Sequence, residues 1–167
     1  MNIRLYQESD AKSVSYLWNQ VFPDNPSHNA PRLVITKKLK VQPLFFVAEK
    51  DSAIGHEGTA LRAIVGTIMA GYDGHRGWLY TVAVTPQHRR QGIGSKLVQH
   101  AESALIAMGC PKINLQVRAS NAEVVAFYKK LGYFTEERIT HGKTSQIACW
   151  SVLEYLPLPS KLTDVPV

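Results

Sequence analysis

Residues 78–95 read WLYTVAVTPQHRRQGIGS: an apolar run, a proline, two adjacent arginines and two glycines ahead of an amphipathic segment. This order predicts a strand, a tight turn and a helix. The backbone N–H groups of a helix's first turn have no partner inside the helix, and with the helix dipole they form an anion site. Gly92 and Gly94 leave room for a bulky anion, and Arg89 and Arg90 add positive charge. The stretch therefore predicts a phosphate-binding turn.

Length and composition indicate one soluble, cytoplasmic domain. The chain has 167 residues, 45% of them hydrophobic and 19% charged, which is ordinary for a globular protein. No apolar run reaches membrane-spanning length, and the polar start MNIRLYQESD is unlike a signal peptide. We expect a single domain over residues 1–155 and a loose, proline-rich tail over 156–167.

A metal site and a nucleic-acid interface are both disfavoured. Cys110 and Cys149 have no metal-ligand spacing, and the six histidines are scattered. The net charge of +6 is spread along the chain, and its one dense cluster, His88 to Arg90, lies in the turn itself. A small polyanionic ligand explains that cluster better than RNA or DNA does.

Hydrophobic periodicity and turn residues predict an alternation of strands and helices. Strands are expected at residues 3–7, 45–50, 64–72, 78–84, 112–117, 134–140 and 146–153. Helices are expected after Asp10, from Pro31 to Val41, from Gly94 to Gly109, and after a capping box of Ser120 and Glu123. The strand, helix and strand around residues 78–117 imply a parallel pair.

Two further motifs make the turn specific. Arg89-Arg90-Gln91-Gly92-Ile93-Gly94 fits the pattern Arg/Gln-x-x-Gly-x-Gly/Ala, and SNAEVVAFYKKLGY follows at 120–133. Together they resemble the GNAT superfamily of acyl-CoA-dependent N-acetyltransferases. A dinucleotide fingerprint needs a glycine where Leu97 stands, and a P-loop needs lysine directly after Gly94.

The resemblance implies an α/β (α+β) fold whose mixed, mostly antiparallel sheet has splayed central parallel strands and is flanked by helices. It also implies acetyl-CoA as cosubstrate and no metal. The diphosphate would lie on the turn, and the pantetheine arm would run along the preceding strand as a short extra strand does. The cofactor-binding residues implied are Val82, Ala83, Val84, Arg89, Arg90, Gln91, Gly92, Ile93, Gly94, Ser95, Asn121 and Tyr128.

Tyr128 matches the general-acid position of the family, where a phenol protonates the departing thiolate. Reference pKa values of about 10 for a phenol and about 8.5 for a thiol make this transfer mildly uphill. Asn121 matches a position that contacts the cofactor arm. The alternatives for these two residues are a core aromatic and a helix cap.

The general base and the acceptor stay open. The strand LQVRASN at 115–121 is similar to that of ribosomal-protein N-terminal alanine acetyltransferases, but Gln116 stands where they have a glutamate base. An amide does not titrate, so Gln116 would at most orient a water or the amine. Other candidates for the base are Glu49, Asp73, His75 and Tyr80. The turn at 71–77 also resembles that of a poorly characterised bacterial GNAT subgroup.

We therefore expect an N-acetyltransferase that moves acetyl from acetyl-CoA to a small-molecule amine or a peptide N-terminus by direct attack in a ternary complex. The alternative is a catalytically silent acyl-CoA sensor or interaction module, which Gln116 keeps open. RNA-directed acetylation is disfavoured by the diffuse charge. No membrane partner is expected, and a homodimer is left open.

Overall fold

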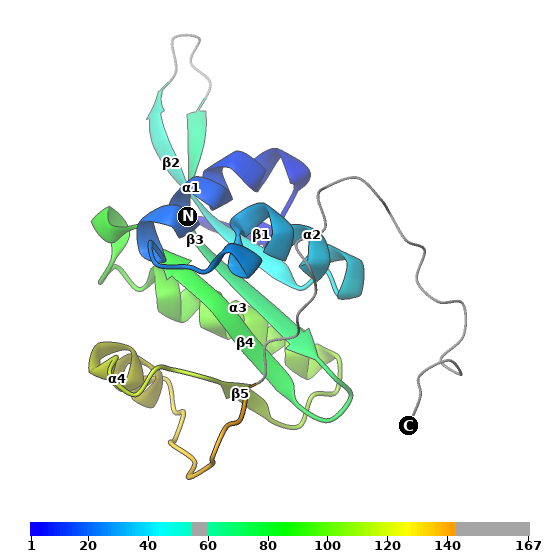
Figure 1. The fold of residues 1–167 in the computed structure, drawn as a ribbon. Helices are drawn as coiled ribbons and strands as arrows, with labels where there is room; N and C mark the ends of the chain where they lie inside the picture. The colour runs from blue at the N-terminus through cyan, green and yellow to red at the C-terminus, as the bar shows by residue number, and fades with distance from the viewer. Residues whose placement is uncertain (55–59, 143–167) are drawn as a thin grey trace, which may run out of the picture. The chain divides into compact units, whose positions relative to one another are not determined.

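A five-stranded sheet organises the described residues, in the order β1-β2-β3-β4-β5 (Figure 1). The computed structural model describes residues 1–54 and 60–142. The strands are β1 (Asn2–Leu5), β2 (Phe45–Ile54), β3 (Ala60–Tyr72), β4 (Gly77–Val84) and β5 (Ile113–Leu115). All neighbours pair antiparallel except β4 and β5, which are parallel. This confirms the expected mixed, mostly antiparallel sheet.

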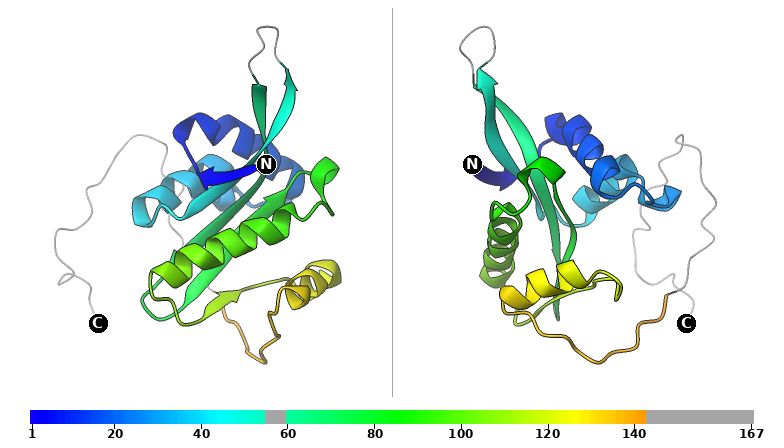
Figure 2. Two further views of the ribbon diagram at one scale, coloured as in Figure 1. Left: turned by 180° about the vertical axis from the view of Figure 1, so that it is seen from behind. Right: turned by 90° about the vertical axis from the view of Figure 1, so that its left-hand side faces the viewer.

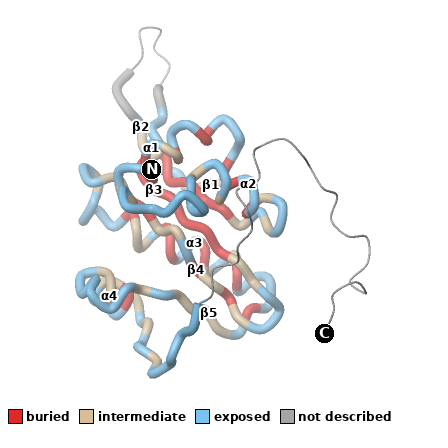
Figure 3. The backbone as a smooth tube through the Cα atoms, viewed as in Figure 1, coloured by how far each residue is buried: buried red, intermediate tan, exposed pale blue. Residues whose placement is uncertain are grey.

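Helices cover both faces of the sheet. They are α1 (Ala11–Val21), α2 (Pro31–Val41), α3 (Ile93–Ala107) and α4 (Ala122–Lys130). Seen along the sheet, α1 and α2 lie on one face and α3 on the other (Figure 2). Each layer of helices buries an apolar stripe against the central strands, which hold most of the buried backbone (Figure 3).

Two hydrophobic clusters hold the fold together. Leu97, Val98 and Leu105 of α3 pack on one face of the sheet, and Tyr128 of α4 joins the same cluster. Val14, Leu17 and Trp18 of α1 belong to the cluster on the other face. All of this lies in the compact unit Met1–Tyr133, while Phe134 begins a second unit that is described only to residue 142.

Strand β4 contains one extra residue at Thr81. Thr67 of β3 pairs with Ala83, and Met69 pairs with Tyr80. Between these pairs β3 has one residue and β4 has two. Thr81 takes up the extra length with φ of 53°, a conformation that is costly for a β-branched side chain.

The bulge at Thr81 exchanges the two faces of β4. Before it, Leu79 packs in the α3 cluster. After it, Ala83 lies in the α1 cluster, and Val82 and Val84 pack on the α3 side. Strict alternation would have placed Leu79 and Ala83 on the same face.

Several sequence-based boundaries are wrong. β2 and β3 run into the segment 51–62, which was expected to be a loop. β5 is three residues long instead of the expected 112–117. Asn121, not Ser120, is the N-cap of α4, so the expected capping box does not form. Residues 134–140 form no strand, and their large apolar side chains, Phe134 and Ile139, are exposed. The expected strand at 146–153 and the tail at 156–167 lie outside the described residues.

Candidate active site

The parallel strands β4 and β5 separate halfway along β4. Their pairing runs from Gly77 opposite Ile113 to Leu79 opposite Leu115 and ends there. β4 continues for five more residues to Val84, and among the described residues no strand pairs with that part on the β5 side. Backbone polar groups along an open strand edge need partners, and an amide-rich chain supplies them in the geometry of an extra strand.

The open edge leads into the turn before α3. Pro86–His88 form a 3-10 turn, and Thr85 Oγ1 lies 2.9 Å from His88 Nδ1. Arg90 and Gly92 both have positive φ, of 60° and 77°. In the described part of the chain, the backbone N–H groups of residues 90–95 donate no hydrogen bond to protein. Successive N–H groups in this conformation at a helix N-terminus bind phosphate oxygens.

The turn residues divide into core and surface. Ile93 is buried under the sheet, so only its backbone is available to a ligand. Gly94 lies close to α4, because a Cβ built on it would be 3.3 Å from Phe127 Cζ. Ser95 is half-buried and Gly92 is exposed, with nothing within 4 Å of an added Cβ. These groups fit a diphosphate that approaches the backbone closely.

Three polar side chains of the turn are held by neighbours. Arg90 forms an ion pair of 2.5 Å with Glu123 in the first turn of α4, where both side chains are about four-fifths exposed. Arg89 Nε donates to the Val84 carbonyl at 3.4 Å. Gln91 accepts from Lys50 and donates to the Gln87 carbonyl. The expected positive charge is therefore present at the turn, with Arg90 already sharing a carboxylate.

Asn121 and Tyr128 are both positioned by α4. The Asn121 side chain accepts from the Val124 N–H at 3.3 Å, so its capping role is confirmed. Tyr128 is 8% exposed and packs edge-on against Phe127 and Tyr133. No described residue hydrogen-bonds its hydroxyl. Burial raises the pKa of Tyr128 to about 12, so the phenol is protonated at neutral pH.

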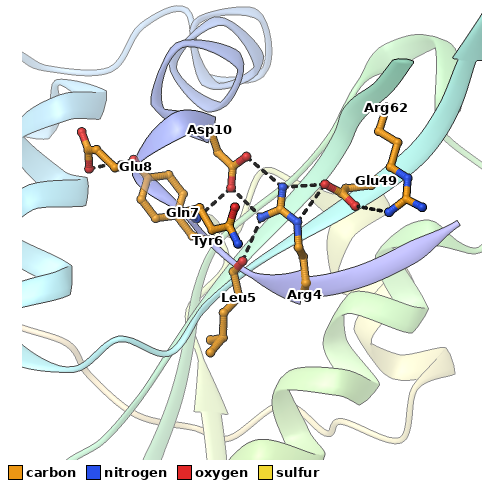
Figure 4. Close-up of polar contacts among 8 residues, drawn as sticks. All are labelled: Arg4, Leu5, Tyr6, Gln7, Glu8, Asp10, Glu49 and Arg62. Carbon is orange, nitrogen blue, oxygen red and sulfur yellow. Dashed lines mark hydrogen bonds and ion pairs between the residues drawn. The ribbon is translucent and has the colours of Figure 1, made fainter. Parts of the chain in front are cut away.

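Two of the candidate bases, Glu49 and Asp73, already form hydrogen bonds within the protein. Glu49 is buried and accepts from Arg4 at 2.8 Å, and Arg62 approaches its other oxygen (Figure 4). Asp73 accepts from the backbone of His75 and Arg76, and these bonds lower its pKa. Both carboxylates are therefore engaged in interactions within the protein.

The remaining candidates lie apart from one another. His75 is exposed in the β3–β4 turn, and Gln116 is exposed one residue beyond β5. Tyr80 follows the last β4 residue that pairs with β5, and its hydroxyl donates to the Ala70 carbonyl at 3.3 Å. Burial raises the Tyr80 pKa. Of the candidate bases, only Tyr80 lies on the open stretch of β4.

Lys38 is a buried polar residue next to Tyr80 that sequence reasoning missed. It lies on α2, is 7% exposed, and its Nζ donates to the Ala70 carbonyl and lies 5.3 Å from the Tyr80 ring centre. Burial lowers its pKa to about 8. The sequence carried a signal, because Lys38 follows the buried Ile35 by three residues and so shares its helix face.

A separate open pocket lies between α1, β3 and the turn after β4. It has a volume of about 550 Å³ and is lined partly by Tyr16, Gln20, Ile64 and His88. Neither Tyr128 nor residues 80–84 line it. It therefore does not coincide with the opening between β4 and β5.

Among the described residues, no three His, Cys, Asp or Glu side chains lie together as metal ligands. In the same residues, no helix is long and apolar enough to cross a membrane.

A parallel strand pair that opens ahead of a helix N-terminus with N–H groups free in the described structure is an arrangement able to hold a phosphate-bearing chain, and comparison with known proteins gives its family. The profile of the Acetyltransferase (GNAT) family matches residues 11–133. The chain belongs to this family.

Curated and solved relatives agree with that assignment. "Acetyltransferase YE1169" of Yersinia enterocolitica is 42% identical over 144 residues, which cover 86% of this chain and 94% of the relative. A structure of AAC(6')-Iy with the bisubstrate analogue CoA-S-monomethyl-acetylneamine has a TM-score of 0.66 at 18% identity and covers 86% of this chain and 97% of its own. The ribosomal-protein-S18-alanine N-acetyltransferase of Escherichia coli has a TM-score of 0.59 at 22% identity, covering 78% and 76%. Because these sequence identities are low, the two structures are evidence for the fold alone.

Proposed function

We propose that the protein transfers an acetyl group from acetyl-CoA to a primary amine by direct attack within a ternary complex. The observation that carries the proposal is the open edge of β4, which runs from Tyr80 to Val84 directly into the turn before α3. A phosphopantetheine arm needs this sequence of strand edge and phosphate cradle. Membership of the GNAT family supports the same assignment.

The turn would hold the diphosphate through the N–H groups of residues 90–95, with Arg89 and Arg90 adding charge. Val82, Ala83 and Val84 would hold the arm through their backbone, and an N–H of the same stretch would polarise the thioester carbonyl. Asn121 would contact the arm beside its capping role. Acetyl-CoA itself supplies the activated acyl group.

Tyr128 would give its proton to the departing sulfur. With a pKa of about 12, this transfer to a thiolate of reference pKa about 8.5 costs about 5 kcal/mol. The reference values used for the sequence give about 2 kcal/mol. A turnover of about 10 per second corresponds to a total activation barrier of about 16 kcal/mol. The cost of about 5 kcal/mol for proton transfer lies well below this barrier.

The test is Tyr128→Phe, with Tyr133→Phe as the matched control. Tyr133 is partly buried and packs against Tyr128, but its hydroxyl donates to Glu102 at 2.6 Å. Released CoA is measured with a thiol reagent over amines and peptides, and acetyl-CoA affinity by calorimetry. We expect Tyr128→Phe to lower turnover by about 100-fold or more and to change affinity by only a few fold, because general acid catalysis contributes that much.

Two results would count against the proposal. Unchanged turnover of Tyr128→Phe on a good acceptor would remove Tyr128 from the reaction. Tight acetyl-CoA binding with no CoA release over the whole panel would favour the acyl-CoA sensor, the function that the exposed and non-titrating Gln116 keeps open.

A further inference from the structure

Lys38 is a buried cation that lacks an acidic partner among the described residues. Its Nζ donates to the Ala70 carbonyl and faces the ring of Tyr80, and no described carboxylate forms an ion pair with it. Burying an ammonium group without a counter-charge is costly. A ligand that brings a negative charge to Lys38 would offset that cost.

Lys38 lies level with the start of the opening between β4 and β5. Its bonded partner, Ala70, pairs with Leu79 of β4, and Leu79 pairs with Leu115 of β5 as the last parallel pair. The carbonyl that holds Lys38 is therefore in the row of residues where the two strands part. Tyr80, the first residue of the open edge, lies against the lysine.

Lys38 and Tyr128 belong to opposite faces of the sheet. Tyr128 belongs to the cluster on the α3 side, together with Leu79. Lys38 reaches the sheet from α2, on the other side (Figure 2). If Tyr128 protonates the leaving sulfur from one face, the face of Lys38 is the one left for the amine.

The helical layer on that face carries an excess of positive charge. Between Ala11 and Ala48 the only acid is Asp24, which is exposed in the α1–α2 connection. The basic residues of the same stretch are Lys12, Arg32, Lys37, Lys38 and Lys40. A polycationic acceptor would be repelled by this layer, whereas an acceptor with a negative group would be attracted.

We propose that Lys38 binds a carboxylate of the acceptor, so that the substrate is a small amino acid carrying its amine within a few bonds of that carboxylate. This inference rests on the proposed acetyl transfer. The ammonium group has three donors, of which Ala70 takes one, and its single charge matches a monoanion. Tyr80, the titratable side chain that faces Lys38 among the described residues, is neutral at pH 7 and would line the site without competing for the carboxylate.

The experiment compares each of the twenty amino acids with its amide, which keeps the amine and removes the charge. The kcat/KM ratio of acid to amide is measured by CoA release for the wild type, Lys38→Met and Lys38→Arg. Lys37→Met, an exposed neighbour on the same helix, is the control. Comparing ratios between variants cancels the intrinsic difference in amine reactivity.

We expect Lys38→Met to lower the acid-to-amide ratio of the best pair by about 10- to 100-fold, the range for a hydrogen bond to a charged group. Lys38→Arg should keep most of the ratio, and Lys37→Met all of it. Equal losses on acid and amide in both Lys38 variants would overturn carboxylate binding, because that is the result for a proton acceptor or a purely structural residue.

A second measurement does not depend on turnover. Binding of the N-acetylated amino acids and their amides to the CoA-loaded enzyme is followed by calorimetry. One outcome is that an acid binds to the wild type, fails to bind to Lys38→Met, and is not acetylated. This result would support carboxylate binding by Lys38 and contradict the proposed function. Acetyl transfer to amides or polyamines at the same rate in the wild type and Lys38→Met would support the proposed function and contradict carboxylate binding by Lys38. If no acid binds, the Lys38 proposal is overturned.

Discussion

Replacing Lys38 by methionine should change the pH dependence of stability. Burial lowers the Lys38 pKa from 10.5 to about 8 in the folded state. Between these values the unfolded state binds more protons than the folded state, so the stability of the wild type rises with pH across this window. The difference of 2.5 pKa units corresponds to about 3 kcal/mol, at 1.36 kcal/mol per unit. Below pH 8 the full penalty is present, and above 10.5 it is gone.

Methionine carries no charge and therefore no penalty. The variant loses the bond to the Ala70 carbonyl, worth about 1 kcal/mol, and the contact with Tyr80. It should still be more stable than the wild type at pH 7, by about 1–2 kcal/mol. That advantage should shrink with pH and reverse near pH 10.5, because the wild type then buries a neutral amine that keeps its contacts.

Urea unfolding between pH 7 and 10.5 measures this. The wild type is compared with Lys38→Met and with the exposed Lys37→Met, and the pair is repeated in a Tyr80→Phe background because Tyr80 titrates next to the lysine. Tyrosines far from Lys38 cancel in the difference. If the difference in unfolding free energy between wild type and Lys38→Met changes by less than about 0.5 kcal/mol over this range, Lys38 is not buried as a cation and the reasoning fails.

Two further predictions concern the turn and the ion-pair cluster. Gly94→Val should destabilise the protein by about 1–3 kcal/mol and weaken acetyl-CoA binding in calorimetry, because its Cβ alone would lie 3.3 Å from Phe127; Gly142→Val, with nothing within 4 Å, is the control, and equal effects would contradict the close approach. Arg4→Met should cost about 3 kcal/mol in urea unfolding because it removes the ion-pair partner of the buried Asp10 and leaves the buried Glu49 only the longer contact with Arg62. Burial raises the pKa of Asp10, but bonds from Arg4 and the Gln7 N–H lower it on balance. The wild type should therefore lose stability as pH falls below about 4, and the loss should be smaller in Arg4→Met, whose Asp10 lacks the Arg4 bonds; parallel acid profiles would refute this.

The sequence predicted helices α2 and α3 and the turn before α3 from local signals, namely glycine and proline positions and hydrophobic periodicity. The turn before α3 and the apolar stripe of α3 were both expected, because glycine positions and a 3.6-residue period are local properties. α2 begins at Pro31 and ends at Val41 as predicted. The GNAT resemblance then implied the separation of β4 and β5, which residue patterns alone do not encode.

The errors arose where tertiary contacts decide. Residues 116 and 117 continue an apolar-polar alternation, yet β5 ends at Leu115 because β4 offers no partner beyond Leu79. The N-cap of α4 passed to Asn121, which competes with Ser120 for the same helix start. Lys38 was not singled out within its helix, since a sequence does not show that the neighbouring strand presents a carbonyl to it.

Because of the bulge at Thr81, the number of residues in β4 determines which face of the sheet each later side chain takes. A substitution does not change that number. Inserting one residue after Thr81 would shift the alternation by one and carry Val82, Ala83 and Val84 to the opposite faces. The turn that follows would rotate with them and present its N–H groups to the wrong side. Natural variants should therefore tolerate changes in the identity of residue 81 far better than an insertion between Thr81 and Thr85, and a glycine at this position should relieve backbone strain without moving the turn.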